Sequence, residues 1–173
     1  MSSPDRPLTL VLVGPMASGK TSIGRKVARI LDVPFVDTDK RIVAAHGPIA
    51  QIFAEHGEGH FRALEREAVA QAVTEGGVVS LGGGAVTDVG TRTLLAQHPV
   101  VFLTVSADAV AARIGGSSRP LLNGDDDPVA RWRTIFEQRR GWYEELADLT
   151  VDTSRRPMRA MAEEIASWRK DHP

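Results

Sequence analysis

Short apolar runs alternate with longer amphipathic stretches along most of the chain. Strand-sized apolar runs cover residues 8–13, 33–36, 77–81 and 100–105, and residues 150–153 form a shorter, more polar run. Between these runs, apolar side chains recur at helical spacing, as in the series Ile23, Val27 and Ile30. Strands that alternate with helices are typical of an α/β domain with a mainly parallel sheet. The pattern therefore predicts five strands in a three-layer α/β fold.

Glycine and proline divide the helical stretches. Gly47-Pro48 and Gly57-Glu58-Gly59 interrupt the pattern between residues 42 and 73, so two or three helices are expected there rather than one. One helix is expected to start near Lys40. Further helices are predicted over residues 87–96, from 107 to about 114, over 129–146 and from 158 to about 168. The nearly continuous apolar run at 100–105 indicates a strand that is buried on both faces.

Composition narrows the class of protein. The 173 residues fit a single domain, which we expect to span residues 1–173. The formal net charge is −1 with both signs interspersed, which argues against a broad nucleic-acid surface. There are no cysteines, so disulfides, thiolate zinc sites and a cysteine nucleophile are excluded. No signal-peptide pattern or membrane-length apolar run is present, so we expect a soluble, cytoplasmic protein without membrane contact.

The segment with the most specific chemistry is LTLVLVGPMASGKT, residues 8–21. An apolar strand runs into Gly14, four further residues and then Gly19-Lys20-Thr21, which is the spacing of a phosphate-binding P-loop. In such a loop, backbone N–H groups and the start of the next helix hold the phosphates, and the lysine adds a positive charge. The threonine hydroxyl can bind Mg²⁺. A plain glycine turn is the alternative, but the flanking strand and helix favour binding of a nucleoside triphosphate.

Two carboxylates follow the second predicted strand. Asp37 and Asp39 come at its end, which in an open α/β sheet faces the ligand crevice. They are therefore expected to lie near the phosphates. An ordinary helix N-cap is the alternative for Asp39, because aspartate is common at that position.

Three further features each allow two interpretations. Arg62 and Glu65 are three residues apart and can form a pair on a solvated helix face or belong to a site. Gly82–Gly84 follow a strand and can let a ligand or another segment approach the backbone closely and adopt positive φ, or can form a flexible turn. The segment 115–128 is too long for a tight connection and can be a lid or a mobile loop, with Arg119 as a surface charge in the simpler case.

The ordered set of motifs resembles the shikimate kinase family. The motifs are GPMASGKT, DTD at 37–39, FRALE at 61–65, GGG at 82–84, RPLL at 119–122 and Arg-x-x-x-Tyr at 139–143. A P-loop alone is shared by many unrelated nucleotide-binding proteins, whereas the other five motifs in this order are specific. The resemblance covers nearly the whole chain. It implies a nucleoside-monophosphate-kinase-like fold, with substrate-binding helices at about 40–75 and a mobile lid at about 115–128.

The resemblance also implies an activity and a role for each matched residue. The reaction would be ATP plus shikimate giving ADP plus 3-phosphoshikimate, in chorismate and aromatic amino-acid biosynthesis, by a monomeric enzyme. The implied catalytic residues are Lys20, Asp39 and Arg119. The implied ATP-binding residues are Gly14, Ala17, Ser18, Gly19, Lys20, Thr21, Ser22, Arg113, Arg119, Arg156 and Pro157. The implied shikimate-binding residues are Asp39, Arg62, Gly82, Gly83, Gly84 and Arg139, and the implied Mg²⁺ residues are Thr21 and Asp37.

These implied roles fit the chemistry of the two substrates. Guanidinium groups such as those of Arg62 and Arg139 match the planar carboxylate of shikimate. A carboxylate such as that of Asp39 can hold ring hydroxyls and accept the proton of the attacking one. Arg119 would neutralise charge on the transferred group, and Asp37 would hold magnesium through water.

The sequence departs from the family pattern in two places. The family has glycine where this chain has Ala17, which costs about 1 kcal/mol if the residue needs a positive φ. This spelling of the loop resembles that of tRNA dimethylallyltransferases, which lack the other motifs. The chain is also one residue shorter between Arg113 and Arg119 and in the loop between Asp152 and Pro157. These deletions bear on which residues flank the adenine.

Two other functions are compatible with parts of the pattern. One is a different small-molecule kinase of the same fold, such as a gluconate kinase, from which the GGG and RPLL motifs distinguish this chain. The other is a catalytically silent nucleotide-binding homologue. The complete set of Lys20, Thr21, Asp37 and Asp39 argues against a silent protein, which has no need of all four.

Overall fold

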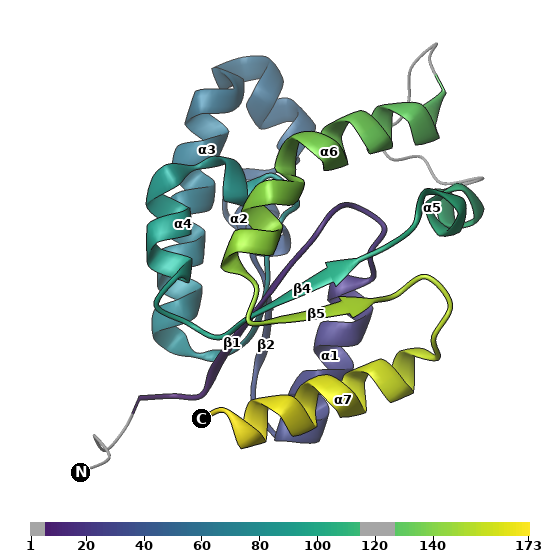
Figure 1. Cartoon of the computed structure of the whole chain (residues 1–173). Helices are drawn as coiled ribbons and strands as arrows, with labels where there is room; N and C mark the ends of the chain where they lie inside the picture. Colours follow the sequence, from purple (N-terminus) through teal and green to yellow (C-terminus); the bar gives the residue numbers. More distant parts are fainter. Residues whose placement is uncertain (1–5, 115–126) are drawn as a thin grey trace.

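The central element is a parallel five-stranded sheet with the order β2-β3-β1-β4-β5. The computed structural model describes residues 6–114 and 127–173 (Figure 1). The strands are β1 (Thr9–Val13), β2 (Phe35–Asp37), β3 (Gly77–Ser80), β4 (Val100–Thr104) and β5 (Leu149–Asp152). Every neighbouring pair is parallel. The predicted α/β class and strand number are confirmed, and the sheet order is new information.

Helices cover both faces of the sheet (Figure 1). One face is covered by α1 (Lys20–Leu31) and α7 (Met158–Asp171), which pack on each other. The other face carries α3 (Ile49–Glu75), η1 (Ala85–Thr87), α4 (Val89–Leu95) and α6 (Pro128–Leu146). Two further helices lie in the described ranges: α2 (Thr38–His46) packs on α3, and α5 (Ala107–Ile114) packs on α6. None of the helices in the described ranges is long and apolar enough to cross a membrane.

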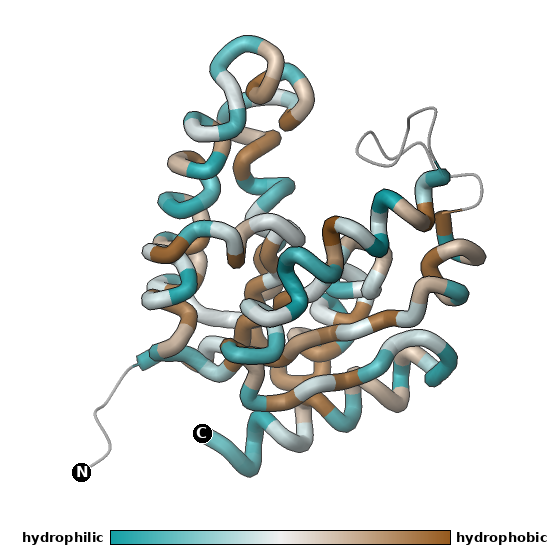
Figure 2. Tube along the Cα trace, turned by 45° about the horizontal axis from the view of Figure 1, so that its top comes forward, coloured by the Kyte–Doolittle hydropathy of each residue, from teal (hydrophilic) through white to brown (hydrophobic). Residues whose placement is uncertain are grey.

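Each central strand contributes to two cores. In β1, Val11 and Val13 pack beneath α3 and α6, whereas Leu10 and Leu12 pack beneath α1 and α7. The apolar colour in Figure 2 accordingly gathers in the sheet and on the sides of the helices that face it. A parallel sheet that is covered on both faces needs apolar residues at successive positions. This explains the unbroken apolar runs, and burial of β4 on both faces is confirmed.

The predicted helix breaks are confirmed, but two helix starts are corrected. Helix α2 ends at Gly47, and α3 is kinked at Gly57, which has φ 82° and ψ 171°. The helix expected near Lys40 begins at Thr38 because Asp37 caps it. The single helix predicted over 87–96 is divided into η1 and α4. Asp88 separates them because its carboxylate accepts the N–H of Thr91 and starts α4.

The predicted lid at 115–128, with Arg119 and the RPLL motif, lies outside the described residues except for its last two. Those two begin α6. Asp127 accepts the N–H of Val129 at 3.0 Å, and Pro128 occupies the first turn, where its missing N–H has no helical partner to lose.

The contact of α1 with the sheet gives a test of this architecture. A Cβ on Gly24 would lie 2.6 Å from Cε2 of Phe35 and 3.0 Å from a methyl carbon of Leu12. Gly24→Ala should therefore lower the free energy of unfolding by about 1 kcal/mol or more through overpacking. This occurs although alanine is favoured over glycine in a helix by about 1 kcal/mol. Urea denaturation measures the change.

Gly141 in α6 supplies the matched control, because a Cβ built there has no other described part of the chain within 4 Å beyond its own helix backbone. Gly141→Ala should raise the free energy of unfolding by about 0.5 to 1 kcal/mol through helix propensity alone. Two substitutions that both stabilise the protein would contradict the packing of α1 described here.

Candidate active site

The phosphate loop joins the end of β1 to the start of α1. Gly14 has φ 150°, and a Cβ there would lie 2.3 Å from the carbonyl oxygen of Leu103, so only glycine fits. Gly19, with φ 89°, is the N-cap residue of α1. The ammonium of Lys20 donates to the carbonyls of Gly14 and Pro15 at 2.8 and 2.9 Å. The lysine side chain therefore lies against the phosphate loop, where it is predicted to add a positive charge.

Ala17 has a strained backbone conformation at the position where the family has glycine. Its φ is 66°, in the left-handed region that favours glycine. The cost of about 1 kcal/mol that was expected for alanine at a positive φ therefore applies to Ala17. Ala17 nevertheless lines the phosphate pocket, as a glycine at this position would.

Asp37 joins the phosphate loop to α2. Its Oδ2 accepts the hydroxyl of Thr21 at 3.0 Å, and its Oδ1 accepts the N–H of Lys40 at 3.2 Å. Asp37 is therefore the N-cap of α2, and the alternative of Asp39 as the N-cap is wrong. Thr21 and Asp37 together offer two oxygen ligands. Within the described ranges no group of three or more His, Cys, Asp and Glu side chains could hold a metal. These two oxygens suit Mg²⁺, which commonly takes few protein ligands and completes its shell with phosphate and water.

Asp39 lies on the wall of the same pocket as Lys20 and Thr21. Burial raises the pKa of its carboxyl, and the nearby Asp37 raises it further, whereas Lys20 and Arg62 lower it. The carboxylate is thus a stronger base than an exposed aspartate. It faces the glycine loop as well as the phosphate loop.

The glycine loop, Gly82–Gly84, has charged groups packed against its bare backbone. A Cβ on Gly82 would lie 2.6 Å from Oδ1 of Asp39, and one on Gly84 would lie 2.5 Å from Nη2 of Arg62. The expected close approach to this backbone is made by other segments of the chain, and side chains at these two positions would displace the carboxylate and the guanidinium.

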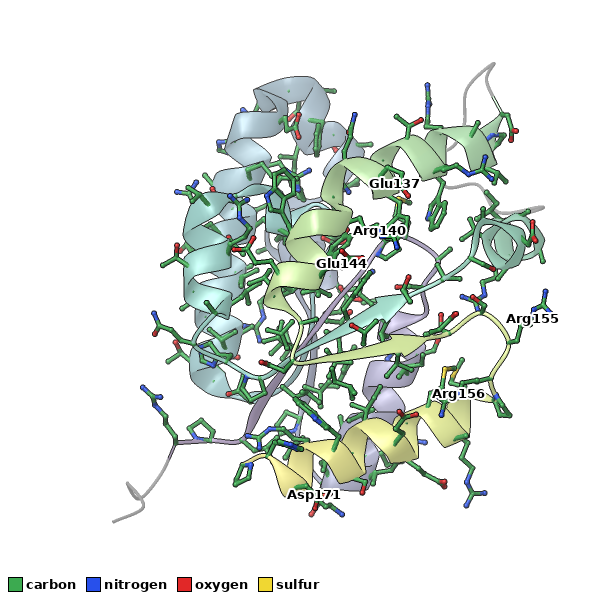
Figure 3. All side chains as sticks on the ribbon, viewed as in Figure 1. Glu137, Arg140, Glu144, Arg155, Arg156 and Asp171 are labelled. Carbon is green, nitrogen blue, oxygen red and sulfur yellow. The ribbon has the colours of Figure 1, made fainter. Side chains whose placement is uncertain are left out.

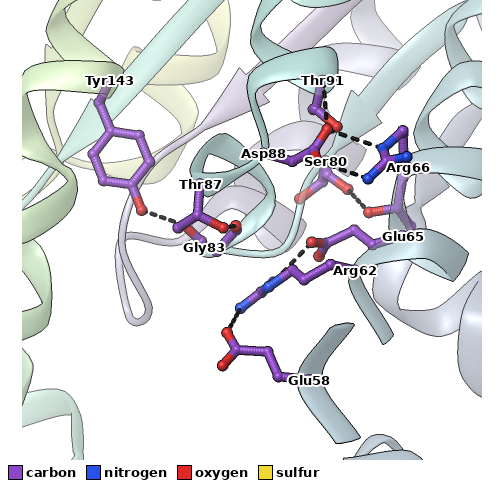
Figure 4. A network of polar contacts seen from close by, with 12 residues as sticks. Glu58, Arg62, Glu65, Arg66, Ser80, Gly83, Thr87, Asp88, Thr91 and Tyr143 are labelled. Atoms are coloured by element: carbon purple, nitrogen blue, oxygen red, sulfur yellow. Dashed lines mark hydrogen bonds and ion pairs between the residues drawn. The ribbon is translucent and has the colours of Figure 1, made fainter. Parts of the chain in front are cut away.

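Two hydroxyl groups fix this loop from neighbouring elements (Figure 4). Thr87 donates to the carbonyl of Gly84 at 2.7 Å, and Tyr143 donates to that of Gly83 at 2.5 Å. Tyr143 comes from α6, so a distant helix holds the glycine loop in place. Burial raises the pKa of Tyr143 to about 12, partly offset by Arg139, so the phenol keeps its donor proton.

Arg62 and Glu65 form the pair that their spacing suggested, but it is buried rather than solvated. Nη1 of Arg62 lies 2.7 Å from Oε1 of Glu65, whose side chain is 3% exposed (Figure 4). Burial raises the pKa of Glu65 to about 7, while Arg62 lowers it by charge and hydrogen bonding. Glu58 accepts a longer contact from Nη2 at 3.4 Å. The buried Nε of Arg62 has no hydrogen-bond partner in the part of the chain that the structure describes.

Arg139 approaches the glycine loop from α6. Its Nη1 lies 3.6 Å from the position of a Cβ on Gly83. Both Arg139 and Arg62 lower the pKa of Glu65 and that of Tyr143, so the two guanidinium groups act on the same buried region. Two cations from separate helices therefore meet at one loop.

The phosphate pocket has a volume of about 310 Å³, and Arg62, Gly84 and Arg139 are not in its lining. It is lined by Met16, Ala17, Gly19, Lys20, Thr21, Ser22, Asp37, Asp39, Ser80, Leu81, Gly82 and Gly83. These residues follow the carboxyl ends of β1, β2 and β3. Because β3 lies between β1 and β2, the phosphate loop, the aspartates and the glycine loop share one crevice.

The residues expected near the adenine have protein partners. Arg113 donates to the carbonyls of Ala17 at 2.6 Å and Thr153 at 2.5 Å. Arg156 projects from the loop after β5 and pairs with Glu164 on α7 (Figure 3). Pro157 is the residue that precedes α7. Contact of these side chains with adenine stays a prediction.

Sequence reasoning gave no role to three residues that support the site. Tyr143 is the last residue of the Arg-x-x-x-Tyr motif, so that motif could have indicated a role for it. Thr153 donates to the Ser18 carbonyl at 2.8 Å, and Trp132 donates to the Met16 carbonyl at 2.8 Å. Neither is close in sequence to the loop that it contacts, so no local pattern indicates them.

Comparison with known proteins decides the family. A family model described as shikimate kinase matches residues 16–170. Shikimate kinases from Salinispora arenicola and Mycobacterium avium are 46% and 47% identical over 160 residues, covering 91% of this chain and 95% and 90% of theirs. This chain belongs to the shikimate kinase family.

Solved structures agree with this family. A shikimate kinase from Acinetobacter baumannii, in complex with shikimate, is 31% identical with a TM-score of 0.89, covering 96% of this chain and 94% of its own. A gluconokinase from Sinorhizobium meliloti has a TM-score of 0.64 at 20% identity, over 96% of this chain and 93% of its own. The gluconokinase shares the fold alone. The shikimate kinase fold, with its parallel sheet between helical layers, is therefore established for this chain.

The buried carboxyl of Glu65 predicts a pH dependence of stability. Folding raises the pKa of this carboxyl from its ordinary value of 4.5 to about 7, so between these pH values the folded state binds more protons. The free energy of unfolding should therefore fall as pH rises through this window. Relative to Glu65→Gln, we expect the wild type to lose on the order of 1 to 3 kcal/mol between about pH 5 and pH 8. Urea denaturation at several pH values measures this.

The exposed Glu67 on the same helix provides the control. Glu67→Gln should keep the wild-type pH dependence. Parallel stability curves for the wild type and Glu65→Gln would contradict a raised pKa at Glu65.

Proposed function

We propose that this chain transfers the γ-phosphoryl group of ATP to the 3-hydroxyl of shikimate, giving ADP and 3-phosphoshikimate in the biosynthesis of chorismate and aromatic amino acids. Membership of the shikimate kinase family supports the reaction. The observation that carries the substrate assignment is the approach of Arg62 and Arg139 to the same glycine loop, beside the phosphate pocket. Two guanidinium groups there suit an acceptor with a carboxylate.

On the nucleotide side, the residues from Gly14 to Ser22 would hold the phosphates. Backbone N–H groups of the loop and the N-terminus of α1 favour an anion, and Lys20 adds its charge to the transferred group. Its ammonium would exchange the carbonyls of Gly14 and Pro15 for phosphate oxygens. Thr21 and Asp37 would hold Mg²⁺, which screens the phosphate charge when bound.

On the acceptor side, Asp39 would accept the proton of the attacking hydroxyl. The raised pKa of Asp39 makes it a better base. Lys20 lies close enough to oppose this shift and lowers the pKa. Arg62 donates to Glu65 through Nη1, and its buried Nε has no hydrogen-bond partner among the residues that the structure describes. The Gly82–Gly84 backbone lets the ring approach closely.

Other parts of the proposal rest on the resemblance. Arg119, outside the described residues, would neutralise charge on the phosphoryl group from a closing lid. Arg113, Arg156 and Pro157 would flank the adenine. We propose a monomeric, cytoplasmic enzyme that binds no nucleic acid.

The acceptor carboxylate gives the sharpest test. Wild-type enzyme should strongly prefer shikimate to its methyl ester, and should phosphorylate gluconate poorly. Arg62→Ala and Arg139→Ala should each cost on the order of 2 to 5 kcal/mol in kcat/KM for shikimate, because the anion loses a buried partner. Each should also lose most of the preference for the acid, while the KM for ATP barely changes. A coupled assay of ADP release measures all of these.

Arg140 is the matched control, because it neighbours Arg139 but points to solvent and pairs with Glu137 and Glu144 (Figure 3). Arg140→Ala should behave as wild type. If both site variants keep the wild-type preference for the acid, the carboxylate is bound elsewhere. Faster turnover of gluconate than of shikimate would favour the gluconate kinase alternative, and no turnover of either would favour a silent homologue.

Substitutions of Asp37 and Asp39 should have different effects on the activity. Asp37→Asn should chiefly raise the magnesium concentration needed for activity, because the residue orients the metal's ligands. Asp39→Asn should lower kcat by about a hundredfold or more even at saturating magnesium, because the proton acceptor is lost. A magnesium titration of each variant measures the difference. Full rescue of both variants by magnesium would remove Asp39 from the chemistry.

A further inference from the structure

Three successive carbonyl groups of the phosphate loop are each held by a side chain from a distant part of the chain. The donors are Nε1 of Trp132 to Met16 at 2.8 Å, Nη1 of Arg113 to Ala17 at 2.6 Å, and Oγ1 of Thr153 to Ser18 at 2.8 Å. They come from α6, from α5 and from the loop after β5. The outer side of the loop is therefore anchored at three consecutive peptides.

This anchoring orients the donors that a phosphate needs. In a planar trans peptide, the carbonyl of one residue and the N–H of the next point in opposite directions. The chain has no cis peptide in its described residues, so the Met16 carbonyl bonded to Trp132 directs the N–H of Ala17 to the other side. Ala17 lines the phosphate pocket and has the unfavourable φ of 66°. An external hydrogen bond is a physical means of holding such a strained loop in shape.

Trp132 is built to make this bond. Its side chain is buried, at 3% exposure, and stacks on Phe136 with ring centroids 5.1 Å apart. Indole nitrogen is a donor only, so burial at this position requires an acceptor, and the Met16 carbonyl provides it. The packing fixes the ring and the hydrogen bond fixes the loop.

The same helix also reaches the acceptor side of the pocket. Trp132, Arg139 and Tyr143 of α6 line one small cavity together with Pro15 and Met16 of the phosphate loop. Tyr143 in turn holds the carbonyl of Gly83. One rigid helix thus contacts both loops of the site.

We propose that Trp132 is a positioning residue for the nucleotide, whose indole N–H holds the phosphate loop in its binding conformation before ATP arrives. The proposal rests on the proposed function, because it takes ATP as the nucleotide. It adds a specific role for a residue that is not in the lining of the phosphate pocket. The role lies in the N–H group, whereas the aromatic ring serves packing.

The test removes the N–H and keeps the aromatic packing. Trp132→Phe should weaken ADP binding, measured by calorimetry without shikimate, and raise the KM for ATP, each by about three- to tenfold. The KM for shikimate should change by less than about twofold, since Arg139 stays on the same helix. Replacing Trp132 by 3-benzothienylalanine, which has sulfur in place of the indole nitrogen, should give the same result without loss of ring volume.

Trp142→Phe is the matched control, because Trp142 is also on α6 but stacks beneath Arg92, away from the loop. It should bind ADP as the wild type does. Unchanged ADP binding in the folded benzothienylalanine variant would overturn the proposal, as would an equal loss in Trp142→Phe. A wild type that binds no ADP would also overturn it. A wild type that binds ADP but does not phosphorylate shikimate would refute the proposed function, while the ADP comparison would still decide the role of Trp132.

Discussion

The buried ion pair between Arg62 and Glu65 packs against the glycine loop, which forms one wall of the phosphate pocket. Both charges leave water beside a backbone without side chains, since Gly84 receives the guanidinium and Gly82 lies against the carboxylates. Buried charges are tolerated when they are paired and hydrogen-bonded, and removing one partner leaves the other at high cost. The pair lies within α3 and packs against the glycine loop. It holds Arg62 at a defined place, with Nε lacking a hydrogen-bond partner among the described residues.

Helix α6 gives the site its rigidity. Tyr143 and Trp132 donate to carbonyls of the glycine loop and the phosphate loop, and Arg139 lies between them in sequence. Side chains on helices hold a constellation more closely than loops do, because packing restricts their rotamers. The stacked rings of Trp132, Phe136, Tyr143 and Phe102 anchor this helix on β4. Through α6, these aromatic contacts hold the glycine loop and the phosphate loop in place.

The candidate site was predictable where its chemistry is local. The spacing of Gly14, Gly19 and Lys20 defines a loop whose function follows from nearby backbone, and Asp37 follows a strand that ends at the crevice. The role of Glu65 was not predictable in the same way. Two residues three apart in a helix give the same sequence pattern whether water or a glycine loop covers them. The burial of Glu65 and its raised pKa therefore depend on tertiary packing. Trp132 gave no sequence signal at all.

The sequence by itself determined the five strands, the α/β class, the phosphate loop and the breaks at Gly47 and Gly57. Each of these follows from short-range constraints: hydrophobic periodicity, positive φ and capping. Only the tertiary structure decided that β3 lies between β1 and β2, and that α6 reaches both loops. Strand order and helix placement arise from contacts between residues far apart in the chain. Those contacts bring two aspartates and a lysine around one pocket, and two arginines against the glycine loop beside it.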